Sequence, residues 1–248
     1  MSLALRLAGR GLGQTWPNPS VGCVVVKDGR MVGRGWTQPP PGNHAEVEAL
    51  NRAGKRALGA IAYVTLEPCC HYGRTPPCTM ALIHAGVRRV VVAATDPFSR
   101  VDGRGIEQLR QTGIRVDIGL MREEAEALNA GFLLNVTKNR PMVTLKLATS
   151  LDGKIATRSG ESQWITGAHA RASGHRLRAS HDAIMIGSGT ALADDPTLTC
   201  RLPGLDDRSP VRVVLSRRCR LPLGSKLVTN ARKMPTWLVT STDAPPAT

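Results

Sequence analysis

The chain has 248 residues, of which 42% are hydrophobic and 21% charged, a composition that fits one large globular domain or two small ones. No run of about 18 apolar residues occurs, so the sequence predicts no membrane-spanning helix. The 33 basic and 19 acidic residues give a net charge of +14, which favours an anionic partner. Aromatic residues make up only 3%, so base-stacking side chains are scarce, and we expect a phosphorylated small molecule rather than nucleic acid.

The cysteines bear on the cellular compartment. Six cysteines in a chain of this length do not form a disulfide scaffold, and the N-terminal residues lack the long apolar stretch of a secretory signal. We therefore expect a cytoplasmic protein. In that reducing environment, clustered cysteines indicate metal binding or catalysis.

The first part of the chain alternates between helix and strand patterns. Helices are expected over residues 1–13, 44–54, 78–87, 104–114 and 123–135. Strands are expected over residues 60–67 and 88–96, together with two strands in 21–36 that flank a turn at 27–30. This alternation predicts an α/β domain with a largely parallel sheet.

The pattern breaks at Asn139-Arg140-Pro141, which we interpret as a linker. A second α/β unit is expected to start at residues 142–150, with a strand, a turn and a short helix in 181–196 and further strands in 210–216 and 236–241. The expected domains are therefore residues 1–140 and 141–248.

Three of the six cysteines lie in the stretch TLEPCCHYGRTPPC, residues 65–78. His44 and Glu46 form an H-x-E pair, Cys69 follows a proline, and Cys78 lies nine residues further on. The arrangement H-x-E … P-C-x-x-C is typical of zinc-dependent base deaminases, although here the gap between the two cysteines is longer. One imidazole and two thiolates suit a catalytic zinc ion, which takes three protein ligands. Glu46 is placed to take a proton from the attacking water and give it to the departing amine.

Other interpretations of these residues stay open. The pair His44 and Glu46 alone would be an ordinary helix start, and two cysteines alone could be buried thiols or part of a structural zinc site. Cys70 and His71 compete with Cys69 as ligands. We rank them lower because adjacent residues seldom both point at one metal without strain.

At this point the sequence resembles the bifunctional deaminase/reductase family of riboflavin biosynthesis, the RibD family. The stretches that carry the resemblance cover most of the chain in the family's order: PNPSVGCVVVKDG (17–29), HAEVEAL (44–50), TLEPCCHYGRTPPC (65–78), DGRG (102–105), LKLATSLDGKIA (145–156), GESQWITG (160–167) and LADDPTLT (192–199).

The resemblance implies a three-layer domain like that of cytidine deaminases, followed by an α/β domain similar to dihydrofolate reductase. The first domain would bind Zn²⁺ and deaminate 2,5-diamino-6-(5-phosphoribosylamino)pyrimidin-4(3H)-one, releasing ammonia. The second would use NADPH to reduce the ribosyl group of the product. A homo-oligomer is also implied.

The resemblance assigns roles to individual residues. In the deaminase, the zinc ligands would be His44, Cys69 and Cys78, the proton shuttle Glu46, and the substrate contacts Asn18, His71 and Arg74. In the reductase, the neighbours of NADPH would be Ala148, Trp164, Thr190 and Asp194, and those of the substrate Ser162, Arg178, Leu198 and Arg201.

Three departures from the family pattern affect these expectations. Phe98 stands where the family has an asparagine that could bond substrate, and Ser216 stands where it has an acidic residue near the cofactor. The chain also ends at Thr248, before further strands and a glycine-rich loop of the family's reductase. We therefore expect a working deaminase and an incomplete reductase-like domain.

Two rival functions are considered. A nucleic-acid deaminase acting on tRNA would explain the net charge and the zinc site, but not the second α/β unit. A non-catalytic zinc module for assembly would leave Glu46 without a task, and would hold the metal through four protein ligands.

Overall fold

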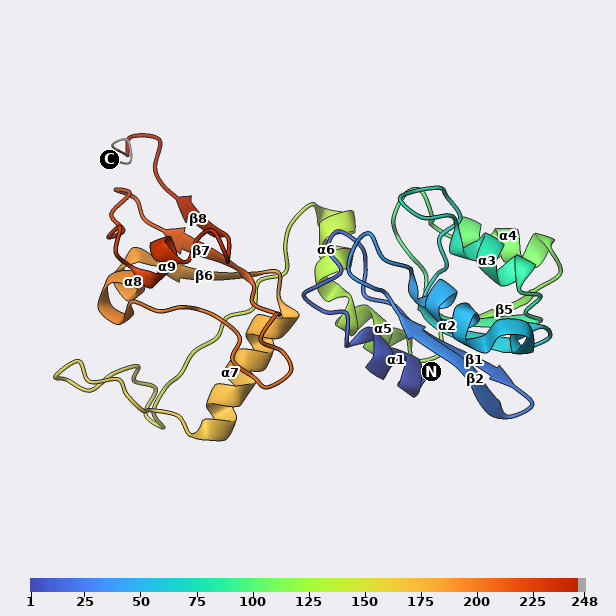
Figure 1. The fold of residues 1–248 in the computed structure, drawn as a ribbon, viewed down its shortest axis with the longest axis horizontal. Coiled ribbons are helices and arrows are strands. Elements are labelled where there is room, and N and C mark those ends of the chain that lie inside the picture. The colour runs from blue at the N-terminus through green and yellow to red at the C-terminus, as the bar shows by residue number, and fades with distance from the viewer. Residues whose placement is uncertain (245–248) are drawn as a thin grey trace. The chain divides into compact units, whose positions relative to one another are not determined.

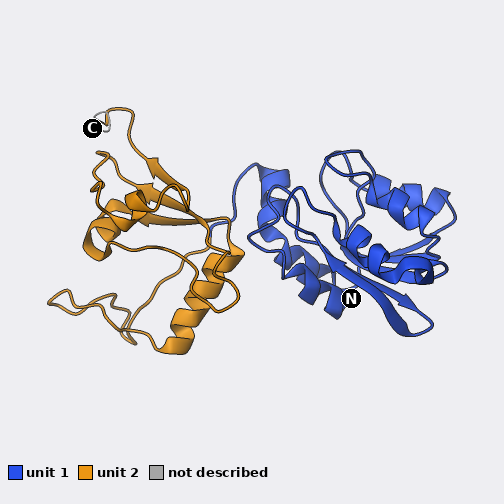
Figure 2. Cartoon of the chain, in the orientation of Figure 1, with its two compact units in different colours: residues 1–143 blue, residues 144–248 orange. Residues whose placement is uncertain are grey.

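The structure is a computed structural model that describes residues 1–244 and divides into two compact units, Met1–Val143 and Thr144–Thr248 (Figure 2). The boundary expected from the sequence lies three residues earlier, before Pro141. The last four residues of the expected second domain, 245–248, lie outside the described residues. None of the helices in the described part of the chain combines the length and the apolar character needed to cross a bilayer.

Unit 1 is built on a five-stranded sheet of order β2-β1-β3-β4-β5 (Figure 1). Its strands are β1 (Gly22–Lys27), β2 (Arg30–Trp36), β3 (Ile61–Leu66), β4 (Arg89–Ala94) and β5 (Arg115–Ile118). The expectation of a largely parallel sheet is wrong for half of the pairings, because β1 runs antiparallel to both β2 and β3. The tight Asp28-Gly29 turn, with both residues at positive φ, forces the first of these pairs to be antiparallel. The pairs β3–β4 and β4–β5 are parallel.

Helices cover both faces of this sheet. They are α1 (Ser2–Ala8), α2 (Ala45–Ala53), the short 3₁₀ helix η1 (Gly54–Ala57), α3 (Cys78–His84), α4 (Arg104–Gln111), α5 (Arg122–Leu128) and α6 (Ala130–Lys138). Neighbouring residues of β1 point to opposite faces, as in any strand: Val24 packs with Leu7 of α1, whereas Val25 belongs to the core cluster that contains Ala49 of α2. The contacts α1–α5 and α2–α3–α4 make two helical layers, as expected for a three-layer domain.

Three local expectations for unit 1 are corrected. The first helix ends at Ala8 rather than near residue 13, because a glycine-rich run of turns follows it. Strand β5 was not expected, since it has only four residues. The single helix expected over 123–135 is two helices that meet at Asn129. The buried Asn129 amide bonds both the N–H and the C=O of Ser20, at 2.9 and 3.0 Å, and so fixes the break.

Unit 2 contains a three-stranded parallel sheet of order β6-β7-β8. Its elements are α7 (Ala168–Ser180), β6 (Ala183–Gly187), α8 (Ser188–Asp194), β7 (Val211–Leu215), α9 (Lys226–Thr229) and β8 (Thr236–Val239). The three strands and α8 confirm the sequence-based expectation, while α7 and α9 were not expected. The stretch 142–167 forms no helix or strand among the described residues, although we expected the unit to begin there with regular structure.

The position of α2 depends on two glycines of β2. A Cβ atom on Gly33 would lie 2.1 Å from the carbonyl oxygen of Ala49, and one on Gly35 would lie 2.5 Å from that of Ala45. Strand and helix backbones therefore touch without intervening side chains. Because His44 and Glu46 lie at the start of α2, this close approach sets the position of two candidate site residues.

We expect Gly33→Ala to lower the free energy of unfolding of unit 1 by roughly 1–3 kcal/mol, the usual cost of inserting a methyl group into a well-packed core. Urea denaturation measures the change. The matched control is Gly189→Ala on α8, where a Cβ would meet nothing within 4 Å. Its free energy of unfolding should be unchanged or slightly higher. An equal loss in both variants would show that the space around Gly33 does not matter.

Candidate metal centre and active site

Three ligand-type side chains converge at one edge of unit 1. His44 is the N-cap of α2, Cys78 is the first residue of α3, and Cys69 lies in the loop that follows β3. The Nδ1 atom of His44 lies 3.5 Å from the Sγ of Cys69 and 3.3 Å from the Sγ of Cys78. All three donor atoms lie within 4.8 Å of one another.

This spacing fits a tetrahedral zinc ion. Zinc binds sulfur at about 2.3 Å and imidazole nitrogen at about 2.1 Å, so two such ligands of one tetrahedron lie about 3.6 Å apart. The observed distances between nitrogen and sulfur are close to that value. Two thiolates and one imidazole also favour zinc over magnesium or calcium, which prefer oxygen ligands.

Hydrogen bonding between the two cysteines shifts their pKa values in opposite directions. The thiol of Cys78 hydrogen-bonds to Cys69 and lowers the pKa of Cys69 to about 4, and the backbone N–H of Cys78 also donates to the Cys69 sulfur at 3.4 Å. In return, the Cys69 thiolate and burial raise the pKa of Cys78 well above its usual value. One thiolate therefore exists at neutral pH, ready to bind a cation.

Glu46 lies in the first turn of α2 and is only 3% exposed. Burial and, to a smaller extent, the negative charge of Cys69 raise the pKa of Glu46 to about 7 against the opposing effect of His44. A carboxyl group with a pKa near neutrality can both accept and return a proton, as a proton shuttle must. The first turn thus brings His44 and Glu46 to the same site although they are only two residues apart.

A cavity of about 400 Å³ opens in front of these residues. His44, Glu46 and Cys69 line it, while Cys78 is not among the lining residues. The three residues expected to contact the pyrimidine or its phosphate also line the cavity: Asn18, His71 and Arg74. The structure therefore brings every expected residue of the deaminase site to this cavity or directly beside it. Its volume is within the range of small-molecule sites.

The competing ligands are directed elsewhere. The thiol of Cys70 donates to the carbonyl oxygen of Arg100 at 3.5 Å. The ring of His71 packs against the ring of Phe98, with centroids 5.9 Å apart. The buried Nδ1 of His71 has no hydrogen-bond partner among the described residues, which suits a side chain that awaits a ligand. Phe98, a departure from the family pattern, is itself a wall of the cavity.

Sequence reasoning missed several residues of the cavity. Asp96 follows β4 and Glu67 follows β3, and both carboxyl groups are buried. A signal was available, because both are acidic residues at the carboxyl ends of neighbouring parallel strands, where sites gather. The wall formed by Phe132, Asn135 and Val136 of α6 had no such signal, since it depends on the helix break at Asn129.

In unit 2, the structure brings together three of the four expected substrate contacts. Arg178 on α7 donates to the carbonyl oxygen of Thr199 at 2.9 Å and lies 3.3 Å from the Nδ1 of His175. The backbone N–H of Arg201 donates to the same Nδ1 at 3.2 Å. Leu198, buried and at positive φ, lies in the same segment. The two arginines lower the pKa of His175, though less than its burial does.

The remaining expected residues of unit 2 are more dispersed. Thr190 and Asp194 lie on the exposed side of α8, while Ala148, Ser162 and Trp164 belong to the stretch 142–167. The ring of Trp164 lies 4.4 Å from the guanidinium carbon of Arg171. No hydrogen bond or ring contact among the described residues links the expected NADPH neighbours on α8 to Ala148 or Trp164.

Ser216, the other departure from the family pattern, follows β7 and is 2% exposed. Its hydroxyl accepts a hydrogen bond from the N–H of Arg220 at 3.0 Å. The Ser216 side chain thus stabilises the turn after β7, and this buried position carries no charge, unlike the acidic residue of the family pattern.

The buried Asp96 should make the stability of unit 1 depend on pH. Burial, the largest cause, raises the pKa of Asp96 from 3.8 to about 6, and Glu67 adds to the shift. A carboxyl group that binds its proton more tightly when folded stabilises the fold below about pH 4, and this contribution is lost as pH rises through about 6. A shift of about two pKa units corresponds to about 3 kcal/mol at most.

We therefore expect the free energy of unfolding of the metal-free chain to fall more steeply between pH 4.5 and 7 than that of Asp96→Asn. Asparagine preserves the shape and the oxygen that accepts the N–H of Phe98 at 2.9 Å, but it does not titrate. Urea denaturation across this pH range measures the difference. Parallel pH profiles for the two chains would contradict the assignment.

Comparison with known proteins agrees with both units. The family model "Cytidine and deoxycytidylate deaminase zinc-binding region" matches residues 1–94, and "RibD C-terminal domain" matches residues 141–248. The riboflavin biosynthesis proteins RibD of Aquifex aeolicus and Escherichia coli are 48% and 52% identical over 97% and 89% of this chain. The chain spans about two thirds of these curated relatives, 67% and 63% of their lengths.

Solved structures give the same result. RibD of Acinetobacter baumannii is 47% identical, with a TM-score of 0.88 over 96% of this chain and 68% of its own. The deaminase/reductase of Thermotoga maritima is 44% identical, with a TM-score of 0.89 over 99% of this chain and 71% of its own. The match to the RibD C-terminal domain does not show unit 2 to be incomplete. Identity at this level through both units means that the chain belongs to the RibD family.

Proposed function

We propose that unit 1 is a zinc-dependent hydrolytic deaminase of a phosphoribosylaminopyrimidine. The observation that carries the proposal is the buried carboxyl group of Glu46, which lines the same cavity as two of the three candidate zinc ligands. The solved relative from Thermotoga maritima is described as a diaminohydroxyphosphoribosylaminopyrimidine deaminase and a 5-amino-6-(5-phosphoribosylamino)uracil reductase. We extend the first of these substrates to this chain by family membership.

His44, Cys69 and Cys78 would hold the zinc ion, which when bound supplies the Lewis acidity that lowers the pKa of a water molecule. Glu46 takes a proton from the water that attacks the amino-bearing ring carbon. It then delivers a proton to the departing nitrogen, so that one water is consumed and one ammonia is released for each amino group replaced by oxygen. The pKa of Glu46, raised to about 7 by burial, suits both transfers.

The cavity supplies groups for the rest of the substrate. The unpartnered Nδ1 of His71 offers a hydrogen bond, and the amide of Asn18 offers both a donor and an acceptor for the edge of a pyrimidine. Arg74 is exposed in the loop between the cysteines and suits the ribose phosphate, because its guanidinium matches the geometry of a phosphate. A phosphorylated substrate also agrees with the net charge of +14.

Ammonia release by the zinc-loaded chain tests the proposal, with Glu46→Gln as the variant. We expect kcat to fall by a factor of about 10²–10⁴, the usual contribution of a positioned acid/base, while zinc content stays near one per chain. The matched control is Glu48→Gln, two residues further along α2, where the carboxylate bonds Asn43 and Arg52 instead. That variant should keep wild-type turnover.

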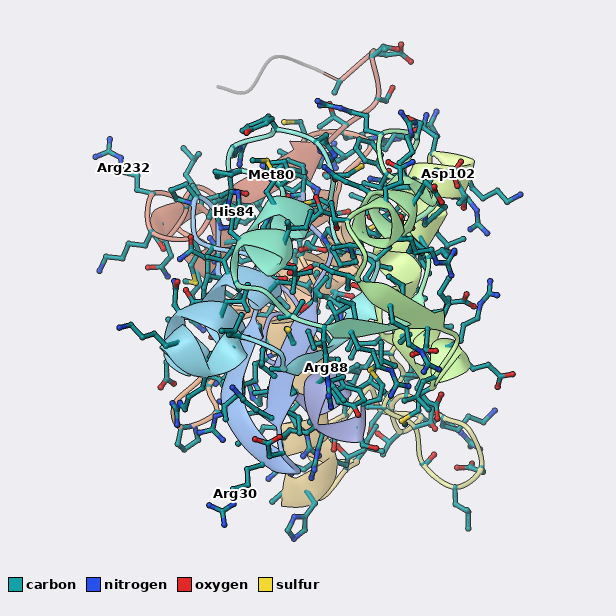
Figure 3. The ribbon with its side chains drawn as sticks, turned by 90° about the vertical axis from the view of Figure 1, so that its right-hand side faces the viewer. Arg30, Met80, His84, Arg88, Asp102 and Arg232 are labelled. Atoms are coloured by element: carbon teal, nitrogen blue, oxygen red, sulfur yellow. The ribbon has the colours of Figure 1, made fainter. Side chains whose placement is uncertain are left out.

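Full activity of Glu46→Gln would remove the proposed shuttle and favour a non-catalytic zinc module. Zinc binding without ammonia release by the wild-type chain would leave the nucleic-acid deaminase as the next candidate. Release of ammonia from an oligonucleotide, but not from the pyrimidine nucleotide, would establish it. Basic side chains do reach solvent, as Arg30 does at the tip of the β1–β2 turn (Figure 3).

We also propose that unit 2 belongs to an NADPH-dependent reductase, since the RibD C-terminal domain matches residues 141–248. Among the described residues, no hydrogen bond or ring contact joins the expected NADPH neighbours of α8 to Ala148 or Trp164, and the proposal for this unit rests on family membership. The basic group of His175, Arg178 and Arg201 suits the phosphate of the substrate. A cytoplasmic location and a homo-oligomer remain predictions.

For this second activity, we expect NADPH oxidation by the chain when the product of the deaminase is supplied. Arg201→Ala should raise the KM for that product about tenfold or more, because a charged hydrogen bond to phosphate is lost. Arg232→Ala is the matched control, since Arg232 projects outward from unit 2 (Figure 3). No NADPH oxidation with an active deaminase would mean that unit 2 of this chain does not act as a reductase.

A further inference from the structure

Glu67 carries a buried charge that the proposed chemistry does not use. It is the first residue after β3, two residues before Cys69, and it is 4% exposed. No lysine, arginine or histidine among the described residues forms an ion pair with it. Burying an unpaired carboxylate is costly unless hydrogen bonds replace its lost hydration, so its partners show what it holds.

Four backbone N–H groups donate to this carboxylate. One oxygen, Oε2, accepts from Asp96 at 3.2 Å and from Gly103 at 3.1 Å. The other, Oε1, accepts from Gly105 at 2.9 Å and from Ile106 at 3.2 Å. The carboxylate therefore closes the loop 96–103 and caps the start of α4, where the helix dipole also favours a negative charge.

The loop that Glu67 closes is a wall of the cavity. Asp96 and Phe98 line the cavity from this loop, and Cys69 lines it from the segment that Glu67 begins. The two segments are packed closely, because a Cβ atom on Gly105 would lie 2.1 Å from the carbonyl oxygen of Pro68. The hydrogen bonds of Glu67 therefore connect two walls of the cavity: the segment that contains the metal ligand Cys69 and the loop that contains Asp96 and Phe98.

The cysteine loop has a second attachment that does not involve Glu67. Thr79, fully buried, donates through its hydroxyl to the Oε1 of Gln108 on α4 at 2.7 Å. Its backbone N–H donates to the carbonyl oxygen of Cys69 at 3.2 Å. Cys69 is therefore held in place even when Glu67 is changed, whereas the loop 96–103 loses its buried anchor.

We propose that Glu67 is a positioning residue that sets the wall formed by Asp96 and Phe98 against the metal ligands, and so determines substrate affinity without holding the metal. This inference rests on the proposed deaminase function. It predicts that a change at Glu67 alters the KM but leaves kcat and zinc content the same. A general loss of stability would not affect the KM alone.

The test is Glu67→Gln in the full zinc-loaded chain. Glutamine keeps the length but offers a single acceptor oxygen, and its NH₂ group faces N–H donors. We expect the KM for the pyrimidine nucleotide to rise about tenfold or more, in line with the loss of charged hydrogen bonds. The kcat should stay within about threefold of wild type. Amide hydrogen exchange should become at least about tenfold faster at Gly103, Gly105 and Ile106.

Leu109→Val is the matched control. Leu109 is fully buried on α4 but gives no hydrogen bond to Glu67, so this change weakens the same helix without releasing the loop. Its KM should equal that of the wild type. If Glu67→Gln does not fold, Glu67→Asp replaces it, because aspartate keeps the charge on a shorter side chain. For that variant we expect the KM and the amide exchange rates to rise by about threefold.

The inference is overturned by unchanged exchange at the anchored amides, or by an equal rise in KM in Leu109→Val. Loss of zinc from Glu67→Gln would also overturn it, because the residue would then hold the metal loop. Hydrogen exchange needs no turnover. If the wild-type chain released no ammonia, the proposed function would fail, while the exchange rates would still decide whether Glu67 anchors the loop.

Discussion

The site depends on one electrostatic constraint: the buried side chains of Glu46 and Cys78 lie close to the half-buried thiol of Cys69. Burial and repulsion by Cys69 raise the pKa of Glu46 to about 7. The hydrogen bond to Cys69, burial and repulsion by Glu46 hold the pKa of Cys78 above its usual value. A divalent cation between the sulfurs would remove most of this repulsion, because a coordinated thiol loses its proton outright. A bound cation would therefore lower the energetic cost of burying the carboxyl group and the thiolates, and the negative charges would in turn favour binding of the cation.

Backbone packing makes this arrangement possible. Side chains between β2 and α2 would move the start of α2, and with it His44 and Glu46, away from the cysteines. Because Gly33 and Gly35 have no side chains, the backbone of β2 lies directly against the carbonyl groups of α2. Gly105 allows the same close approach between α4 and the segment that leads to Cys69. The precision of the site therefore comes from close approach of main chains, which is less adjustable than contact between flexible side chains.

The sequence pattern itself predicted the strands of unit 1 except β5 and the helix starts at His44 and Cys78, although it missed several residues that line the cavity. It could do so because these features are local: a tight turn, a capping position, a proline before a helix. The antiparallel pairing of β1 with β3, the break at Asn129 and the hydrogen bonds of Glu67 depend on contacts between residues far apart in the chain. In unit 2, the stretch 142–167 has the apolar residues of a strand, but alternation alone does not supply a pairing partner.

The count of ligands separates a catalytic metal from a structural one. A structural zinc ion is enclosed by four protein ligands, whereas a catalytic one keeps a position open. Among the described residues, three ligand atoms gather at the site, and the fourth direction is not filled by Cys70, whose thiol bonds a carbonyl oxygen elsewhere. Glu46 and a cavity of about 400 Å³ lie beside the three ligands. A module used only for assembly would have no reason to bury a carboxyl group there, so the geometry favours chemistry on a bound molecule over a purely structural role.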